Sequence, residues 1–219
     1  MADASPALVG APTLGFEPLP PGGWFPPSPD ADAGRAAIAG DLDRAETLYR
    51  EMQGAAGRIG LAVVAGLRGR HAEALALLRP GDADDGALRV LARANECQAL
   101  IGVGDMAAAE DAAAHALKAA RRLKDEALIA AALFALALAH VARGRRGEAR
   151  QRLGEALRGF AKAGDVLRQV QCHHLLGDLA YDAEDAVRAG SHYRDGLALA
   201  RKAGMDEAVE LLTLRFEHR

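Results

Sequence analysis

From Asp30 onward, apolar residues recur every three or four positions, with charged residues between them. This spacing places the apolar side chains on one face of an α-helix, which has about 3.6 residues per turn. Glycines and short polar stretches interrupt the pattern and predict where the helices end. We expect helices near residues 31–39, 41–55, 57–68, 71–79, 86–102, 105–122, 125–143, 146–162, 165–182, 185–202 and 206–217. No segment predicts a convincing strand, so the expected class is all-α.

Small residues recur at fixed distances from five predicted turns, at Gly40, Gly69, Gly104, Gly144 and, imperfectly, Glu184. Five positions after these turns stand Ala45, Ala74, Ala109, Ala149 and Ala189. Seven positions before them stand Ala33, Ala62, Cys97, Ala137 and Gly177, and nine positions after them stand the apolar Tyr49, Leu78, Ala113, Leu153 and Tyr193. Helices approach closely only where the side chains between them are small, so the pattern predicts a row of antiparallel helix pairs.

The motifs of these pairs resemble the tetratricopeptide-repeat (TPR) family. The last pair carries the resemblance best, as Leu176-Gly177-x2-Ala180 followed by Ala189-x3-Tyr193-x2-Gly196. The turns are 29, 35, 40 and 40 residues apart, whereas the common repeat is about 34 residues long. The two longest repeats resemble a variant found in bacterial regulators and peptide sensors. The resemblance, which covers residues 31–203, implies a right-handed helical-hairpin solenoid of about five repeats with a C-terminal capping helix.

The chain divides into a proline-rich arm at residues 1–29, a solenoid at 30–204 and a capping helix at 205–219. The arm holds all but one of the nine prolines and a third of the aromatic residues, Phe16, Trp24 and Phe25. A plain linker is poor in aromatic residues, so we expect these three to dock on the solenoid. The arm would either cap the first helix pair or occupy the groove as a tethered competitor. Its limited reach favours the cap.

Composition adds limits on the function class. Apolar residues make up 50% of the chain but aromatic ones only 4%, so alanine and leucine must fill the core. A net charge of −3 gives no basic footprint for nucleic acid. We expect no membrane insertion, since no apolar stretch approaches about 18 residues, and no secretory signal. Cys97 and Cys172 fall inside predicted helices, which is typical of reduced thiols in a cytoplasmic protein.

Catalytic and metal-binding patterns are weak. Ser191 and His192 are adjacent, so on a helix their side chains diverge by about 100°. The same divergence separates Cys172, His173 and His174, which favours a packed cysteine over a metal site. Residues 82–86 resemble a calcium loop but lack its distal glutamate. The cluster of Arg143, Arg145, Arg146 and Arg150 fits the C-terminal end of a helix. We expect no catalytic residue, no metal and no cofactor.

The groove of the solenoid is the remaining candidate site. In TPR proteins the first helix of each pair lines a concave surface, which here implies positions three, six and ten before each turn. The second and third repeats place Ile59, Val63, Gly66, Ala94, Gln98 and Ile101 there, and the fourth and fifth place Phe134, Leu138, Val141, His174, Asp178 and Tyr181. The apolar members either await a partner or rotate into the core. The family's clamp for acidic C-terminal peptides needs several Lys, Arg and Asn residues, and only Asn95 lies near this face.

The sequence therefore predicts a protein- or peptide-binding scaffold without catalysis. A first alternative is a peptide-sensing module of a bacterial regulatory system, which the long repeats favour and the lack of an output domain disfavours. A second alternative is a small hydrolytic or metal enzyme, which the scarcity of hydroxyl nucleophiles disfavours. Neither the partner nor the oligomeric state is encoded in a motif.

Overall fold

A computed structural model describes residues 22–29, 31–78 and 86–217. These residues form eleven helices and no strand, as the periodicity predicts. The helices are α1 (Asp32–Ile38), α2 (Leu42–Glu51), α3 (Gly54–Leu67), α4 (His71–Leu77), α5 (Gly86–Val103), α6 (Met106–Leu123), α7 (Glu126–Ala142), α8 (Arg146–Ala163), α9 (Val166–Tyr181), α10 (Ala186–Ala203) and α11 (Asp206–Glu217). Their ends lie within a few residues of the predicted ones, and the predicted all-α class is confirmed.

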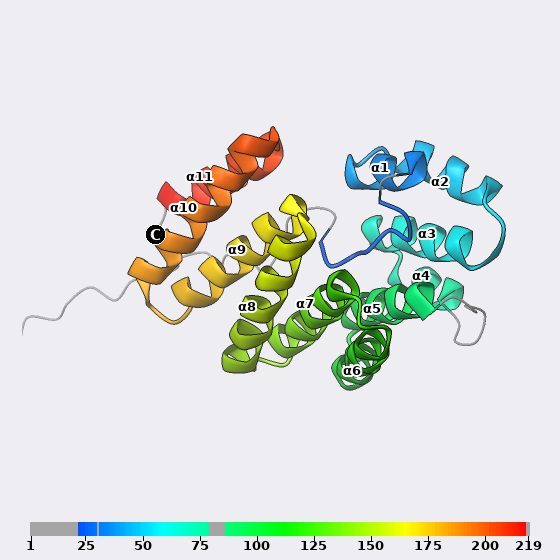
Figure 1. Ribbon diagram of the computed structural model, residues 1–219, viewed down its shortest axis with the longest axis horizontal. Coiled ribbons are helices and arrows are strands. Elements are labelled where there is room, and N and C mark those ends of the chain that lie inside the picture. The colour runs from blue at the N-terminus through cyan, green and yellow to red at the C-terminus, as the bar shows by residue number, and fades with distance from the viewer. Residues whose placement is uncertain (1–21, 30, 79–85, 218–219) are drawn as a thin grey trace, which may run out of the picture.

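The helices form successive hairpins that follow one another along an arc (Figure 1). Each helix packs on its neighbour in the chain, and α5 also packs directly on α3 and α7. Helix α9 joins the row mainly through α8 and α10. The result is a helical-repeat solenoid, in which each hairpin buries its apolar face against the adjacent hairpins.

The predicted turn residues all adopt left-handed backbone conformations, including Glu184 at φ 59°, where four of the five turns use glycine. Several helices begin at an aspartate whose side chain accepts a hydrogen bond from the backbone N–H three residues later, which satisfies an otherwise unpaired donor. These N-caps are Asp41, Asp105, Asp125, Asp165 and Asp185. Local turn and cap chemistry thus sets where each hairpin bends.

The small positions lie at the crossings between paired helices, and all of them are buried. Gly177 shows why the residue must be small: a Cβ atom there would lie 2.3 Å from the ring of Tyr193 on the partner helix. The apolar residues nine positions after each turn are also buried; Tyr49 packs on Gly60 of the next pair, whereas Tyr193 packs back on Gly177 of its own pair. The repeat register taken from the sequence is therefore the register of the fold.

Candidate functional site

The arm lies on the inner side of the arc, where its described residues 22–29 pass between the two halves of the solenoid (Figure 1). Gly23, Trp24, Phe25 and Pro26 are buried, while Pro29 is exposed. The arm's two rings dock on α3, α4, α7 and α9, so the expectation that they cap the first helix pair is wrong, although Ser28 at the end of the arm contacts α1. Residues 26–29 lead from the buried rings toward α1, where the Ala31 N–H donates to the Ser28 carbonyl. Phe16 lies outside the described residues.

Trp24 fills a pocket built on α3 and α4. Its floor is Gly66, where a Cβ atom would lie 2.0 Å from the indole ring. The ring stacks on His71 with an interplanar angle of 6° and a centroid distance of 6.2 Å. Trp24 belongs to a cluster of buried apolar residues comprising Ile59, Ala62, Val63, Ala65, Ala74, Leu78 and Ala99. The pocket therefore accepts a flat, aromatic side chain.

Phe25 enters a different part of the core, between α7 and α9. Its ring meets Phe134 edge-on, with centroids 6.1 Å apart. The guanidinium carbon of Arg168 lies 4.2 Å from the Phe25 ring centroid, which is cation–π geometry. Phe25 is part of the large central cluster formed by α5–α9. Two adjacent arm residues thus join two separate apolar clusters of the solenoid.

Two polar side chains hold the arm's backbone. Asn95 on α5 accepts a hydrogen bond from the Phe25 N–H (2.7 Å) and donates one to the Phe25 carbonyl (2.9 Å). Arg168 on α9 donates to the carbonyls of Gly22, at 2.9 Å, and Trp24. We call Gly66, His71, Asn95, Gln98, Phe134 and Arg168 the arm site. Its polar contacts are to main-chain atoms, so they place few demands on the side chains of the bound segment.

Arg168 is a buried cation, since only 3% of its surface is exposed. Burial lowers its pKa to about 10, which leaves it charged at neutral pH. Its side-chain acceptors are the two arm carbonyls and the Gln171 Oε1 atom at 2.8 Å, and within the described part of the chain no ion pair reaches it. A buried charge is costly unless hydrogen bonds or an opposite charge compensate for it. The described residues of the arm, 22–29, supply hydrogen bonds but no charge.

The other residues predicted for the groove are divided between the core and the surface. Ile59, Val63, Ala94, Phe134 and Leu138 are buried, whereas Gln98, Ile101, Val141 and Tyr181 are half-buried. Of the two possibilities left open for the apolar groove residues, rotation into the core holds for Phe134 and Leu138, which are 0% and 7% exposed. Phe134 packs between the rings of Phe25 and Phe160. An aspartate there would disrupt the fold as well as the site.

His174 and Asp178 lie outside the arm site. Asp178 accepts a hydrogen bond from the Tyr193 hydroxyl at 2.7 Å and lies 3.7 Å from Arg215 Nε on α11. His174 Nε2 is 3.4 Å from the other Asp178 oxygen. The prediction that these two residues line the groove is wrong, because Tyr193 of α10 and Arg215 of α11 cover the side of α9 on which they lie. Burial lowers the pKa of His174 and favours its neutral form.

The other chemical candidates have structural explanations. Cys97 and Cys172 are buried free thiols, and burial raises the pKa of each. His173 pairs with His192 across α9 and α10, with their Nδ1 atoms 3.4 Å apart. Within residues 22–29, 31–78 and 86–217, no cluster of three metal-ligating side chains occurs. The calcium-like stretch at 82–86 falls largely outside the described residues.

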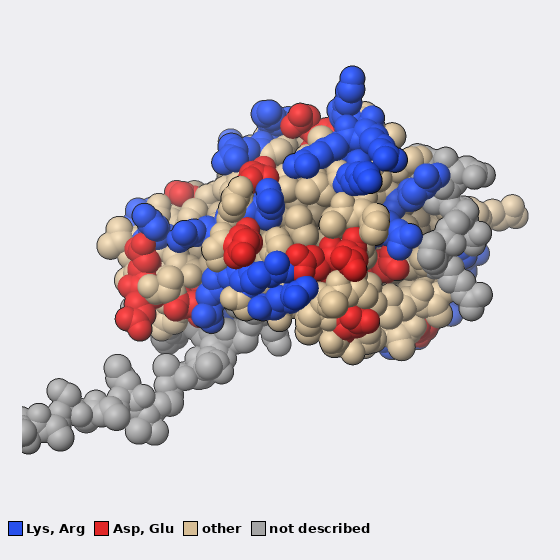
Figure 2. Space-filling view, turned by 90° about the horizontal axis from the view of Figure 1, so that it is seen from below, with Lys and Arg blue, Asp and Glu red and all other residues tan. Residues whose placement is uncertain are grey.

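The surface carries charges of both signs side by side on the face that Figure 2 shows. Arg143 and Arg145 both pair with Glu110, and Arg146 lies 3.1 Å from Asp182, so much of the predicted arginine cluster is neutralised by acids. Among the described helices, none is long and apolar enough to cross a membrane.

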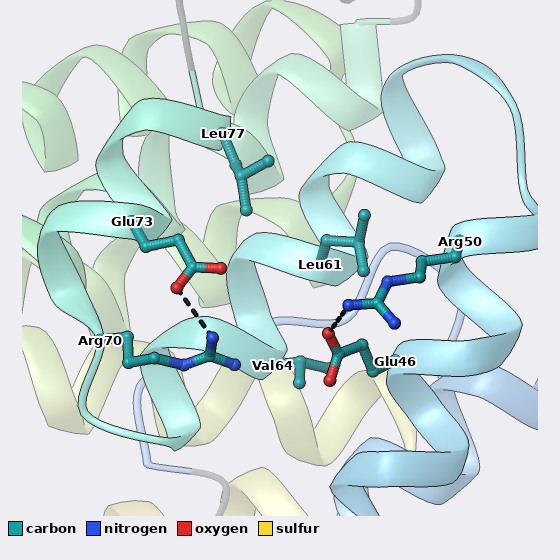
Figure 3. A pocket seen from close by; sticks show the side chains of 7 residues that line it. All are labelled: Glu46, Arg50, Leu61, Val64, Arg70, Glu73 and Leu77. Atoms are coloured by element: carbon teal, nitrogen blue, oxygen red, sulfur yellow. Dashed lines mark hydrogen bonds and ion pairs between the residues drawn. The ribbon is translucent and has the colours of Figure 1, made fainter.

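A small pocket of about 100 Å³ lies between α2, α3 and α4. Figure 3 shows that Arg50 pairs with Glu46 and that Arg70 pairs with Glu73 within it. Leu61, Val64 and Leu77 complete the lining. Because its charged side chains pair with one another, this pocket offers a ligand less than the arm site does.

No protein-family model matches the sequence, and no curated protein matches it. Among solved structures, the apo form of RapI is similar with a TM-score of 0.55 and 17% identity, over 78% of this chain and 52% of RapI. BtubC (BKLC) from P. vanneervenii is similar with a TM-score of 0.54 and 18% identity, over 86% of this chain and 91% of BtubC. The chain thus spans about half of RapI. At these identities the likeness shows a shared helical-repeat fold.

The sequence identified Trp24, Phe25, Gln98 and Phe134 but missed His71 and Arg168, and it marked Asn95 only as a residue near the groove face. Arg168 stands outside the three groove positions of its helix and is one of many arginines. Its partners Gly22 and Trp24 are 146 and 144 positions away in the chain. No local pattern could therefore distinguish it from an exposed arginine.

Proposed function

We propose that the chain is a non-catalytic TPR-type scaffold that binds a non-helical segment of a protein or peptide partner in the arm site. One observation carries the proposal: residues 22–26 occupy this site through backbone hydrogen bonds and two ring-filled pockets. A segment from another chain with the same backbone course would make the same contacts. The amide of Asn95 and the guanidinium of Arg168 are suited to binding, since neither is a nucleophile or a general base at neutral pH.

A selection from a random peptide library tests this function. The bait is the full-length Trp24→Ala/Phe25→Ala variant, which leaves both ring pockets empty. We expect the selected peptides to lose at least about tenfold in affinity when Asn95→Leu is added, because two hydrogen bonds to the peptide backbone disappear. Arg122→Ala, at an exposed position on α6, is the matched control and should leave affinity unchanged. A selection in which no peptide depends on Asn95 would contradict the proposal.

A peptide-sensing module of a bacterial regulatory system is the second candidate. The 18-residue helices α5, α6, α8 and α10 favour it, as does the direct connection of the arm to α1. Spin labels on exposed positions of α2 and α10 would distinguish the two functions. A sensor should change the distance between the labels when a selected peptide binds, whereas a rigid scaffold should keep it.

A further inference from the structure

The identity of the bound segment follows from the chemistry of the arm site, and this inference rests on the proposed function. We propose that the partner segment carries a carboxylate followed by two adjacent aromatic residues, and that it binds by displacing the chain's own arm. The arm is then an internal competitor with the same aromatic pair but without the acid.

The two ring pockets account for the aromatic pair. Gly66 and His71 shape a slot in which the Trp24 ring lies flat, and a β-carbon at Gly66 would close it. The second pocket places Phe134 at the edge of the Phe25 ring and Arg168 over its face. Aromatic side chains satisfy both geometries, whereas an aliphatic side chain offers no ring face to a cation. Because Asn95 bonds the N–H and the carbonyl of the second aromatic residue, proline is excluded at that position.

The carboxylate follows from the partners of Arg168. Apart from the Phe25 ring, the buried guanidinium contacts neutral oxygens, among them the Gly22 carbonyl. The bonds from Arg168 to the carbonyls are already strengthened by the charge of the donor, but only an anionic acceptor adds a direct attraction between opposite charges. An acidic side chain at the position of Gly22 lies next to this guanidinium, and Gly22 has a φ of 61°, which aspartate and asparagine tolerate. The Asp165 charge favours the cationic form of Arg168 without forming an ion pair with it, and a carboxylate at position 22 would add such an ion pair.

The residue between the acid and the first aromatic must be small. A Cβ atom on Gly23 would lie 2.3 Å from the Gln98 side chain. Gln98 Nε2 and His71 Nδ1 are buried without a hydrogen-bond partner among the described residues. The described arm residues therefore leave these two nitrogen atoms without hydrogen bonds. A partner segment that supplied hydrogen bonds to them would bind the arm site more tightly than the arm does.

Competition follows from the tether. A segment held by a short linker acts at an effective concentration in the millimolar range. A free partner with only the arm's contacts would be excluded at ordinary protein concentrations. The added ion pair with Arg168 gives a partner the advantage that it needs over the arm.

Three blocked peptides test the inference by isothermal titration calorimetry. Each is acetylated and amidated and carries the sequence of residues 22–29, either unchanged, with Gly22→Asp, or with Gly22→Asn. The full-length protein and its full-length Trp24→Ala/Phe25→Ala variant are titrated with all three. On the variant, we expect the Gly22→Asp peptide to bind at least about tenfold tighter than the other two. On the unchanged protein, the same peptide should bind at least about tenfold more weakly, because the arm competes.

The controls separate the parts of the inference. Adding Arg168→Gln to the variant should make the Gly22→Asp and Gly22→Asn peptides bind equally. If circular dichroism shows that the Trp24→Ala/Phe25→Ala variant does not fold, the Phe25→Ala single variant replaces it in all titrations. Equal affinity of the Asp and Asn peptides for the folded variant would overturn the carboxylate, and equal affinity for both proteins would overturn the competition. If none of the three peptides binds the folded variant, the inference that the partner carries an aromatic pair is wrong. The proposed function is contradicted only by the separate library experiment, if the selected peptides bind independently of Asn95.

Discussion

Two surfaces of the solenoid helices are covered in different ways. Over α3, α4, α5, α7 and the N-terminal part of α9 the cover is the arm, whose described residues form no helix and rely on two rings and a few backbone hydrogen bonds. Over the C-terminal part of α9 the cover is made by α10 and α11, with the cluster of His174, Asp178, Tyr193 and Arg215 between them. Both covers keep apolar surface from water. The described arm residues, however, are not part of a hairpin, whereas α11 carries part of the last core.

The apolar clusters show the same contrast. Ala208 and Leu212 of α11 share one buried cluster with residues of α9 and α10. Trp24 and Phe25 instead belong to two clusters that the solenoid helices form without them. Removal of α11 therefore destroys a core, while removal of the arm opens two pockets. A permanent cover and a replaceable one can be distinguished by how strongly each contributes to the free energy of unfolding.

The largest effect is expected in the permanent cover. Leu212→Ala should lower the free energy of unfolding by about 2–5 kcal/mol, because the side chain is 0% exposed and its removal leaves a cavity. Leu214→Ala on the same helix is the matched control, since Leu214 is 47% exposed and should change stability little. Chemical denaturation measures both. Equal effects would show that α11 is not part of the core.

The crossings between helices come next. Ala137→Leu and Gly177→Leu should each lower the free energy of unfolding by about 1–3 kcal/mol, because the added side chain has no space. Gly177 is the more crowded position, with Tyr193 against it. Arg158→Leu, at an exposed position on α8, should have little effect. Unchanged melting temperatures for both small positions would refute the repeat register.

Acid should weaken the C-terminal cover. Burial lowers the pKa of His174, so below the unfolded-state pKa of about 6.5 the unfolded chain binds a proton that the folded chain excludes. The free energy of unfolding should therefore fall as the pH drops from about 7 to 5.5, by about 1 kcal/mol for a fully buried histidine. His174→Gln should reduce this loss in denaturation curves measured at both pH values. A loss of the same size in His174→Gln would assign the acid sensitivity to other histidines.

The smallest effect on stability is expected at the replaceable cover. Gly66→Ala should expel Trp24 from its pocket, because the new Cβ atom would lie 2.0 Å from the indole ring. The solenoid itself should change by no more than about 1 kcal/mol, since alanine favours a helix over glycine. Trp24 is the single tryptophan, so its emission should shift to the red as water reaches it. An unshifted spectrum would show that the ring does not depend on this pocket.

The sequence predicted the solenoid well because its signals are local and repeated. Each turn and each small residue recurs with the hairpin, so five instances support one interpretation, and even Glu184 takes the left-handed backbone of the glycines. The site is different. Trp24 and Phe25 stood out by composition, but their place depends on where α3, α7 and α9 meet, which no single repeat encodes. His174 and Asp178 occupy the repeat positions that predict a groove lining, yet side chains of α10 and of the terminal helix α11 cover them.

The end of the arm has a mechanical consequence for the first helix. Helix α1 has seven residues and no side-chain cap at Ala31, whose N–H donates instead to the Ser28 carbonyl at 3.1 Å. Gly34 of α1 lies so close to this carbonyl that a Cβ atom there would be 2.1 Å from it. So short a helix is not stable alone. Withdrawing the arm would therefore remove the Ser28 contacts that stabilise α1. Faster amide hydrogen exchange in α1 would then report that the arm has left the arm site.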